Sequence, residues 1–432
     1  MNSTNYFEHK ESLPIMPHYD IIVCGAGVAG VAAAVSAARQ GSRVLLLEKS
    51  INLGGLATSG LINMFVPGCN GRGTKIIKGM NSELFDLSIK YGYDTVPDAW
   101  KDDSLSPEQH GGQRYMTTFS PNIFALTLTE LVKTSEVSLL LDCTVSEAVM
   151  SDKNGKKHCD GIIVQTKSGR RFYTADVIVD TTGDADLLKT AGVPCIDGKN
   201  YFTYCATKID LDSCQKAVES QNIEKAVKGV HGGNASLYGD NQPTDKPLYN
   251  GASSEDVTEY ITENQLILLD KLKNDDRFSR ELVQIPSMPQ FRTTRCIKGG
   301  HTFSEKDAYR HFEDSIAAIC DFDHRDFLFE VPYRCLVNGG FDNLITAGRS
   351  ACASGYGWDI LRVIPPAIVT GQAAGIAASI AASGKTDINS VDISRLQDAL
   401  RKADVMIHFD DSLIPDNNTV GAGERFDNPD HM

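Results

Sequence analysis

Residues 19–49 read YDIIVCGAGVAGVAAAVSAARQGSRVLLLEK, and the order of residue types in this stretch indicates the fold class. Residues 20–24 are a short apolar run of β-type residues, with the length expected of a buried parallel strand. A glycine-rich turn follows over residues 25–30, and an alanine-rich segment over residues 31–40 predicts a helix. A second apolar strand is predicted over residues 43–47. This order indicates a Rossmann-type β–α–β unit.

The glycines of this turn each have a mechanical reason to be there. Gly25 permits the tight turn, Gly27 lets the backbone approach a pyrophosphate, and Gly30 lets the helix pack closely on the strand. The phosphates would lie on the free amides at the positive end of the helix. Glu48 closes the second strand and would accept hydrogen bonds from an adenosine ribose. We therefore predict an ADP-bearing dinucleotide site; the alternative is a vestigial Rossmann turn that binds nothing.

A second glycine-rich loop comes directly after Glu48. Residues 53–60 read LGGLATSG, in which the glycine pair lets the backbone run close to a ligand. The hydroxyls of Thr58 and Ser59 are available as donors. A flexible loop would have the same composition, but the position after the ribose-binding acid favours contact with the rest of a dinucleotide.

Composition limits the classes of partner. The chain has 432 residues, enough for two compact domains or one large domain with an insertion. Its 42 Lys and Arg against 56 Asp and Glu give a formal charge of −14. This acidic balance argues against nucleic acid and anionic membranes, because phosphate binding relies on clustered basic charge.

Segments without enzymatic motifs also give expectations. Residues 1–18 are polar, without a signal pattern, and predict a flexible arm. Residues 364–382 are small and apolar but contain Gln372 and two prolines, so we predict a buried helix and no membrane span. The 11 cysteines form no C-x-x-C pair, which predicts reduced thiols in a cytoplasmic protein. Zinc-ligand spacing is absent, and no metal site is expected.

The middle of the first half alternates helical and extended patterns. Helices are predicted over residues 81–91 and from Ser120-Pro121, where an N-cap residue precedes a proline. The apolar strand over residues 176–180 runs into Thr-Thr-Gly-Asp, a bare turn at the sheet edge where open α/β folds bind ligands. Four apolar runs separated by turn residues predict a β-meander before it, over 139–141, 143–150, 161–166 and 171–173.

The last third of the chain adds a series of motifs. They are PYRCL at 332–336, DNLITAGR at 342–349, LRVIPP at 361–366 and GQAAG at 371–375. With the G-x-G-x-x-G turn, Glu48 and the Thr-Gly-Asp turn, this series resembles the glutathione-reductase-type FAD flavoproteins. Within them it is similar to the FAD-dependent oxidoreductase branch related to fumarate reductase flavoproteins. The resemblance covers most of residues 19–383 and implies FAD as cofactor.

The resemblance also implies roles for particular positions. In the family, the first glycines and Glu48 hold the ADP half, backbone near Val145 contacts adenine, and residues around Gly183 flank the pyrophosphate. Gly348 and Arg349 lie along the ribityl chain. The positions expected to bind FAD are Gly25, Gly27, Ala29, Gly30, Glu48, Lys49, Gly55, Leu56, Ala57, Thr58, Val145, Thr182, Gly183, Asp184, Gly348, Arg349, Arg362, Val363 and Pro366.

A flavin-binding role for residues 363–366 also has a physical basis that does not depend on the resemblance. Residues 363–366 are expected to open a helix whose amino end points at the pyrimidine ring. A reduced flavin carries negative charge there, which a helix N-terminus with Arg362 beside it stabilises. Pro366 and its neighbour suit a first helical turn. The alternative is that Arg362 is merely a solvated arginine.

Residues 187–331 are predicted to form the substrate-facing part. Helical patterns cover residues 217–227 and 254–274, whereas residues 231–234 and 238–251 are loop-like. Arg292 and Arg295, in a segment that resembles the branch's R-x-x-R-x-x-x-G motif, could bind a carboxylate bidentately. Structural ion pairs with the abundant acids are the alternative.

Candidates for proton transfer lie in the substrate-facing part and in the motif series of the last third. Dehydrogenation needs a base and reduction of an activated alkene needs an acid. The candidates are Tyr356, His301, Arg334 and Asp359. Many relatives carry a histidine in the linker that reads SACASGYGWDIL here, so an inherited assignment does not transfer, and a lone His301 can equally be structural. The predicted catalytic set is Arg362, Tyr356, Arg292 and His301.

The absence of two motifs limits the classes of reaction that we expect. No C-x-x-x-x-C pair follows the glycine loop, which argues against a thiol–disulfide reductase, and no second G-x-G-x-x-G follows a strand, which argues against a built-in NAD(P)H domain. Electrons would come from the substrate, a redox partner protein or transiently bound NAD(P)H. The sequence leaves the oligomeric state and the identity of the substrate open.

We therefore expect an α/β protein with a Rossmann-like three-layer FAD-binding domain, a β-meander and an inserted α/β substrate domain. The predicted parts are a flexible arm (1–18), the first FAD-binding part (19–186), the substrate domain (187–331), and the second FAD-binding part with a C-terminal tail (332–432). The expected function is two-electron dehydrogenation or reduction of a small polar metabolite. Alternatives are a flavin monooxygenase using NAD(P)H and oxygen, or a flavoprotein-fold binding module. A flavin-dependent RNA-modifying enzyme conflicts with the acidic charge.

Overall fold

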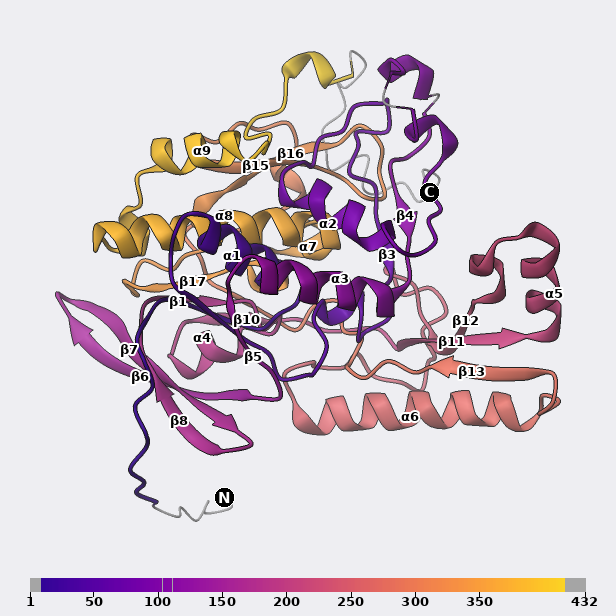
Figure 1. Cartoon of the computed structure of the whole chain (residues 1–432), viewed down its shortest axis with the longest axis horizontal. Helices are drawn as coiled ribbons and strands as arrows, with labels where there is room; N and C mark the ends of the chain where they lie inside the picture. Colours follow the sequence, from indigo (N-terminus) through magenta and orange to yellow (C-terminus); the bar gives the residue numbers. More distant parts are fainter. Residues whose placement is uncertain (1–8, 103, 111, 416–432) are drawn as a thin grey trace.

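A parallel β-sheet lies at the centre of the computed structural model, which describes residues 9–102, 104–110 and 112–415 (Figure 1). Five strands pair in the order β17-β9-β1-β2-β5, and every neighbouring pair is parallel. The strands are Tyr19–Cys24 (β1), Val44–Leu47 (β2), Ser138–Leu140 (β5), Ala175–Asp180 (β9) and Leu344–Thr346 (β17). The β–α–β unit expected from residues 19–49 is confirmed.

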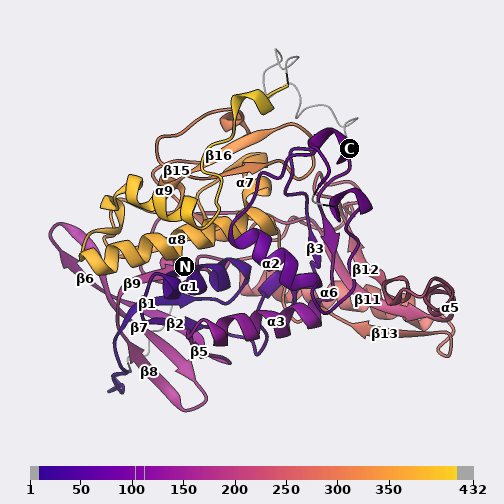
Figure 2. The same cartoon turned by 45° about the horizontal axis from the view of Figure 1, so that its top comes forward.

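Helices cover one face of this sheet. α1 and α8 lie side by side against it, with α2 and α3 beyond them (Figures 1 and 2). A Cβ on Gly371 of α8 would lie 2.2 Å from the carbonyl oxygen of Ala29 in α1, so only a residue without a side chain permits this approach. The helices are Val28–Arg39 (α1), Met80–Ile89 (α2), Pro121–Thr134 (α3) and Ile364–Gly384 (α8).

The opposite face is covered by the antiparallel meander β6-β7-β8 and the short helix α4. Ile21 and Val23 of β1 belong to the core under the helices, whereas Ile22 and Cys24 belong to the core under the meander. Successive strand residues point to opposite faces, so an apolar run without alternation suits a sheet covered on both sides. The elements are Thr144–Lys153 (β6), Lys156–Thr166 (β7), Gly169–Tyr173 (β8) and Asp186–Thr190 (α4). The predicted three-layer α/β fold is confirmed, but the first run expected in the meander, residues 139–141, lies mainly in β5 and pairs in parallel with β2 in the central sheet.

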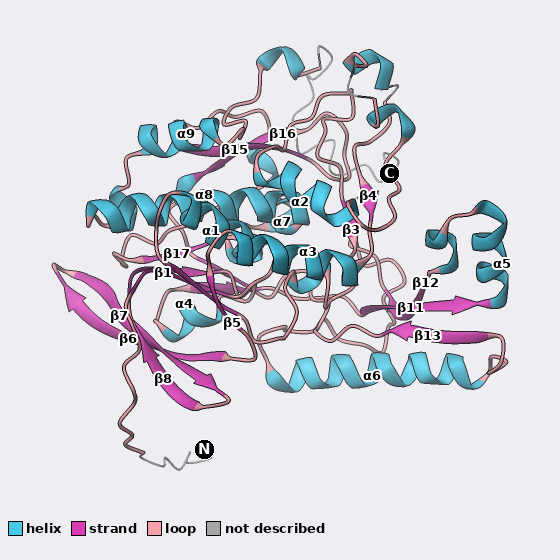
Figure 3. Ribbon diagram, in the orientation of Figure 1, coloured by secondary structure: helices cyan, strands magenta, loops and turns pink. Residues whose placement is uncertain are grey.

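A second, smaller sheet projects from the side of these layers (Figure 3). Its strands pair antiparallel in the order β12-β11-β13, and α6 covers one face. Phe202, Tyr249, Tyr260 and Phe291 form a separate small core there. The elements are Thr203–Asp210 (β11), Leu211–Ser220 (α5), Lys228–Asn234 (β12), Ser254–Lys273 (α6) and Arg280–Gln284 (β13).

Two expectations for this part are wrong. The helix expected over residues 217–227 begins earlier, at Leu211, because Asp210 caps it by accepting a hydrogen bond from the Ser213 amide at 2.8 Å. It ends where Gln221 adopts a left-handed conformation. Residues 231–234, expected to be a loop, lie in β12, whose pairing with β11 overrides the low strand propensity of Gly232-Gly233.

A further layer lies on the outer side of α8. The hairpin β15-β16 and helix α9 pack there, and α7 leads directly into α8 (Figure 2). The predicted boundary between residues 331 and 332 falls inside β16. The elements are Ser315–Cys320 (β15), Leu328–Pro332 (β16), Gly355–Arg362 (α7) and Ile393–Lys402 (α9), and two small pairs join Met64–Phe65 (β3) to Thr117–Thr118 (β4) and Cys195–Asp197 (β10) to Arg295–Ile297 (β14).

α8 is long and apolar enough to cross a membrane by length and composition alone, but its whole apolar window is buried inside the protein. It is therefore the buried core helix that the sequence predicts. Near the N-terminus, the Phe172 amide donates to the Pro14 carbonyl at 3.0 Å, so this part of the predicted arm runs along β8. Residues 1–8 of the arm and 416–432 of the tail lie outside the described residues.

Candidate functional site

A cavity of about 630 Å³ opens at the carboxyl ends of four of the five parallel strands, β1, β2, β9 and β17. This is the edge at which open α/β sheets bind ligands. Of the residues predicted to bind a cofactor, the lining includes Gly25, Gly27, Ala29, Glu48, Lys49, Gly55, Leu56, Ala57, Val145, Thr182, Gly183, Gly348, Arg349 and Arg362. The lining does not include Gly30, Thr58, Asp184, Val363 or Pro366.

Two glycines of the turn after β1 have different surroundings: Gly27 faces the cavity, and Gly30 packs against the backbone. A Cβ on Gly27, the N-cap of α1, would meet no heavy atom of the described residues within 4 Å, so this backbone borders open space. A Cβ on Gly30 would lie 1.8 Å from the carbonyl oxygen of Gly25. The amide end of α1 is therefore exposed to the cavity, where it favours an anion.

Glu48 is fixed at the end of β2 by two backbone amides. Its Oε2 accepts from the Ala26 amide at 2.7 Å, and its Oε1 accepts from the Ser50 amide at 2.8 Å. The side chain is only 8% exposed yet lines the cavity. A carboxylate accepts about four hydrogen bonds, so these two contacts orient Glu48 and leave lone pairs for a ligand hydroxyl.

The loop after Glu48 divides its two hydroxyls between structure and cavity. Thr58 Oγ1 donates to the Leu53 carbonyl at 2.5 Å and thereby holds the loop. Ser59 lines the cavity, and its buried Oγ has no hydrogen-bond partner within the described residues. A buried polar atom without a partner is costly, so Ser59 is the position at which a bound ligand would supply the missing hydrogen bond.

Arg349 links two walls of the cavity. Its Nε donates to the Gly183 carbonyl at 2.8 Å, and its Nη2 pairs with Asp184 Oδ1 at 2.6 Å. Asp184 is thus used by Arg349 instead of facing the cavity. At the foot of the same turn, burial raises the pKa of Asp180 to about 6, although its carboxylate accepts hydrogen bonds from the amides of Thr182 and Leu188.

Another part of the cavity wall is formed where α7 meets α8. α8 begins at Ile364 with Val363 as its N-cap, and prolines occupy its first turn, including Pro366. Arg362, Ile364 and Ala367 line the cavity. Arg362 Nε donates to Asp359 Oδ1 at 2.7 Å. Burial lowers the pKa of Arg362 and the nearby Asp359 carboxylate opposes that shift. The Arg362 side chain is 15% exposed and paired with Asp359, so the solvated alternative is wrong.

Arg292 lies outside the lining but close to this part of the wall. Its guanidinium donates to the carbonyls of Ser236 at 3.0 Å and Ala235 at 3.3 Å. Burial lowers its pKa first, and the positive charge of Arg362 lowers it further, whereas Asp359 raises it. Arg292, Arg362 and Asp359 thus form one electrostatic group. Arg295, by contrast, forms ion pairs with Asp186 at 3.5 Å and Asp197 at 3.4 Å. This is the structural role that the sequence leaves open as the alternative to carboxylate binding.

The remaining proton-transfer candidates are not in the lining. The Tyr356 hydroxyl donates to Asp321 Oδ1 at 2.9 Å and lies 3.0 Å from His324 Nδ1, and burial raises the pKa of Tyr356. His301 Nε2 lies 3.0 Å from the buried Asp307 carboxylate. Both groups are held inside other hydrogen-bond networks, and their catalytic roles stay predictions. Arg334 pairs with Asp314 at the surface, its Nε 2.9 Å from Oδ2.

Sequence reasoning missed one wall of the cavity. Ser287 and Met288 line it from the loop after β13, and the Ser287 amide donates to the Ser59 carbonyl at 2.9 Å. The proline-flanked sequence Pro286-Ser-Met-Pro289, shortly before the Arg292 segment, was the available signal. It marks a loop but carries no chemical motif, so only the tertiary contact reveals its position.

Solved structures with a similar chain trace are distant in sequence. The chain shares 13% identity with the p-nitrophenol 4-monooxygenase PnpA from Pseudomonas putida, covering 92% of this chain and 91% of that one at a TM-score of 0.47. It shares 12% with a geranylgeranyl bacteriochlorophyll reductase-like protein from Thermoplasma acidophilum, covering 92% and 94% at 0.45. With THI4 from Thermovibrio ammonificans it shares 16% at 0.30, over 41% of this chain and 64% of that protein's length.

One protein-family model covers most of the chain. It carries the description FAD dependent oxidoreductase and matches residues 20–205 and 233–400. These ranges include the glycine turn of α1, Glu48, the Thr-Gly-Asp turn and the start of α8, which are the segments that meet around the cavity. The chain belongs to the family of FAD-dependent oxidoreductases.

Proposed function

We propose that the chain binds one FAD along the cavity and uses it for two-electron dehydrogenation or reduction of a small polar metabolite. The finer relationship that we propose is with the glutathione-reductase-type flavoproteins, in the branch related to fumarate reductase flavoproteins. The observation that carries the proposal is one continuous cavity that is lined both by Glu48 and the amide end of α1 and by Arg362 and the amide end of α8.

The residues at the α1 end suit the ADP half of FAD. The open space at Gly27 would admit a pyrophosphate against the helix amides, and the oriented carboxylate of Glu48 would accept hydrogen bonds from the ribose. Val145 also lines the cavity, and we propose that its backbone contacts the adenine. The unpartnered hydroxyl of Ser59 suits a polar atom of the same ligand.

The residues at the α8 end suit the flavin half. Bound FAD would supply two-electron transfer to or from a substrate carbon. The amide end of α8 and the Arg362 guanidinium place positive charge at this end, which stabilises negative charge on the ring system. Asp359 holds Arg362 in position through the hydrogen bond from Nε.

Arg292 supports a more specific proposal about the substrate. Arg292 and Arg362 carry two positive charges beside the single carboxylate of Asp359, so this buried group has a net positive charge. Such a group favours an anion, because a buried charge without a partner is costly. We therefore propose a substrate that carries a carboxylate or another anionic group. A redox partner protein or transient NAD(P)H would complete the electron balance.

The compartment is part of the same proposal. All the cysteines, from Cys24 to Cys352, are free in the structure. Free, mainly buried thiols support a reducing, cytoplasmic location.

Spectroscopy of the purified protein tests the proposal. We expect flavin absorbance at one FAD per chain, and bleaching without oxygen when an anionic metabolite from a panel is the substrate. Arg292→Met should keep the FAD but lose the bleaching, because Arg292 lies outside the cavity lining. A colourless protein that FAD cannot reconstitute would favour a binding module. Oxygen consumption coupled to NAD(P)H, with a hydroxylated product, would favour a flavin monooxygenase.

A further inference from the structure

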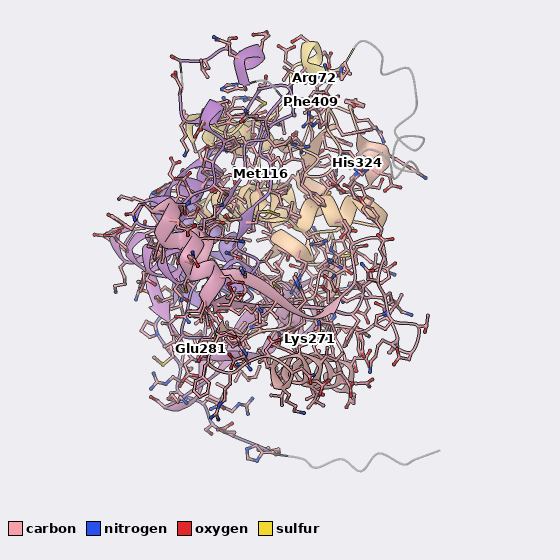
Figure 4. The ribbon with its side chains drawn as sticks, turned by 90° about the vertical axis from the view of Figure 1, so that its right-hand side faces the viewer. Arg72, Met116, Lys271, Glu281, His324 and Phe409 are labelled. Carbon is pink, nitrogen blue, oxygen red and sulfur yellow. The ribbon has the colours of Figure 1, made fainter. Side chains whose placement is uncertain are left out.

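A cluster of two histidines and one glutamate lies outside the FAD cavity. His311 comes from the loop before β15, Glu330 from β16, and His408 from the segment after α9. One potential ligand atom from each of the three residues lies within 4.8 Å of the others. Phe409, labelled in Figure 4, marks this region, far from the α6 and β13 residues Lys271 and Glu281. We name these three residues the His–Glu–His cluster.

Glu330 is the centre of the cluster. Its side chain is 0% exposed, and its Oε1 lies 2.6 Å from His311 Nδ1 and 3.0 Å from His408 Nδ1. Its Oε2 accepts from the Phe312 amide at 2.8 Å, which fixes the carboxylate plane. A fully buried carboxylate needs compensating positive charge. Two imidazole nitrogens face the same oxygen, so the compensating charge is supplied either by protonated histidines or by a cation bound between the three side chains.

The second ring nitrogen of His311 strengthens this interpretation. His311 Nε2 lies 2.9 Å from Asp411 Oδ1, and the Phe409 ring stacks on the imidazole with centroids 4.5 Å apart. Histidines that bind metals usually donate their other ring N–H to a carboxylate, which fixes the tautomer and the ring orientation. Asp411 therefore orients the ring so that Nδ1 is directed at Glu330, and a bound metal ion would take the place of the proton that Nδ1 shares with Glu330 Oε1.

We propose that His311 Nδ1, His408 Nδ1 and Glu330 Oε1 bind one divalent transition-metal ion of the zinc class. Imidazole and carboxylate suit Zn²⁺, which accepts three protein ligands and a water in tetrahedral geometry. Zinc–nitrogen bonds of about 2.0–2.1 Å place neighbouring ligand atoms about 3.3 Å apart. The distances to Glu330, 2.6 Å from His311 and 3.0 Å from His408, therefore need to lengthen by about 0.7 and 0.3 Å.

The surroundings permit this adjustment. The side chains of His311 and His408 are 42% and 40% exposed, so both rings can move outward and a water can complete the coordination. The backbone beside His408 is already held: the Ala318 amide of β15 donates to the Met406 carbonyl at 2.6 Å, and Ser315 Oγ donates to the Ile407 carbonyl at 2.6 Å. The ion would fasten the C-terminal segment to the β15-β16 hairpin.

Zinc titration of the full chain tests the site. After removal of metal with a chelator, calorimetry should show one Zn²⁺ bound per chain. His408→Ala should weaken binding at least about tenfold, and Asp411→Asn, which keeps all three ligands, should weaken it by about tenfold. His18→Ala is the matched control, because His18 is an exposed histidine that also lies beside a carboxylate, 3.4 Å from Asp176.

A structural measurement on the wild-type protein keeps the proposal falsifiable if a variant fails to fold. Zinc-edge X-ray absorption of the loaded protein should show imidazole nitrogens at about 2.0–2.1 Å. The proposal is overturned by equal zinc affinity in the wild type and His408→Ala, or by spectra without imidazole ligands. It is likewise overturned if the wild type binds no zinc, since the histidines then compensate Glu330 as cations alone.

Discussion

Arg349 and Asp184 form an ion pair, Nη2 to Oδ1 at 2.6 Å, across 165 residues of sequence. Arg349 also donates to the carbonyls of Gly183 and Phe291. The Thr-Gly-Asp turn after β9, the loop before β14 and the turn after β17 are thereby joined at one buried guanidinium. Because the guanidinium presents several donors in a fixed plane, one residue sets the distance between the cavity walls.

Replacement of Arg349 should therefore lower the free energy of unfolding as well as FAD binding. Arg349→Met leaves the partly buried Asp184 side chain and two carbonyls without their donor, and we expect a loss of about 3 kcal/mol in the free energy of unfolding. Urea denaturation of the apoprotein measures this loss. Arg334→Met is the matched control: its ion pair with Asp314 is 52% exposed on the arginine side, so its removal should cost less than about 1 kcal/mol. Equal losses in the two variants would contradict the structural role of Arg349.

Gly27 and Gly30 should respond differently to alanine. The added Cβ of Gly27→Ala meets no described protein atom within 4 Å and projects into the space proposed for the pyrophosphate, so this variant should fold normally and lose FAD. The Cβ of Gly30→Ala would lie 1.8 Å from the Gly25 carbonyl oxygen, so this variant should lose stability even without cofactor. Thermal denaturation of the apoproteins and flavin content of the holoproteins separate the two effects. Normal FAD content in Gly27→Ala would argue against a pyrophosphate at α1.

Arg362 should tune the redox potential of the bound flavin. Arg362→Gln removes a positive charge from the cavity and leaves the Asp359 carboxylate without its partner. Both changes disfavour negative charge on reduced flavin, so the midpoint potential should become more negative by about 30 mV or more, equivalent to about 1.4 kcal/mol for a two-electron couple. Anaerobic titration with reference dyes measures the potential. Arg334→Gln, at the surface, should leave the potential unchanged; an unchanged potential in Arg362→Gln would place the flavin ring elsewhere.

Asp210 should make stability depend on pH in the acid range. The ion pair with Lys228 and the hydrogen bond from the Ser213 amide lower the pKa of Asp210 from 3.8 to about 2. A lowered pKa means that the stabilisation is present above about pH 4 and is lost as the pH falls towards 2. Asp210→Asn keeps an N-cap acceptor but removes the charge. The wild type should exceed this variant by about 1 kcal/mol at pH 7, after allowance for solvent screening. Urea denaturation of the apoproteins between pH 2 and 7 should show this difference shrinking to near zero, and a constant difference would contradict the charge effect.

Local patterns were enough for the central layers. The apolar runs at β1, β2 and β9 and the capped start of α3 at Ser120 are encoded by neighbouring residues, so their prediction needed no tertiary contact. The two helix starts at the cavity are also encoded locally. At α1, for example, a strand followed by a glycine-rich turn and a helix brings the amino end of the helix to the sheet edge. Most of the positions that the motif series predicted to bind the cofactor line the cavity, since ligands bind at the carboxyl ends of the strands.

The smaller sheet was predicted less well because its elements depend on partners distant in sequence. Gly232-Gly233 lies in a strand only because β11 pairs with β12. α5 starts at Leu211 because Asp210 caps it, a signal that was present in the sequence but overlooked. In the same way, the sequence identified two hydroxyls after the glycine pair but could not separate Thr58, used by the Leu53 carbonyl, from Ser59 at the cavity.

The order of residues in the chain is enough to predict the family, the parallel sheet and the two helix starts that line the cavity. The reason is that short-range periodicity, glycines and caps act within a few residues. Three features depend on packing between distant segments: Asp184 pairs with Arg349, Tyr356 and His301 lie in networks outside the lining, and His311, Glu330 and His408 lie close together. Such contacts arise when segments far apart in the chain pack together, and no local pattern records them.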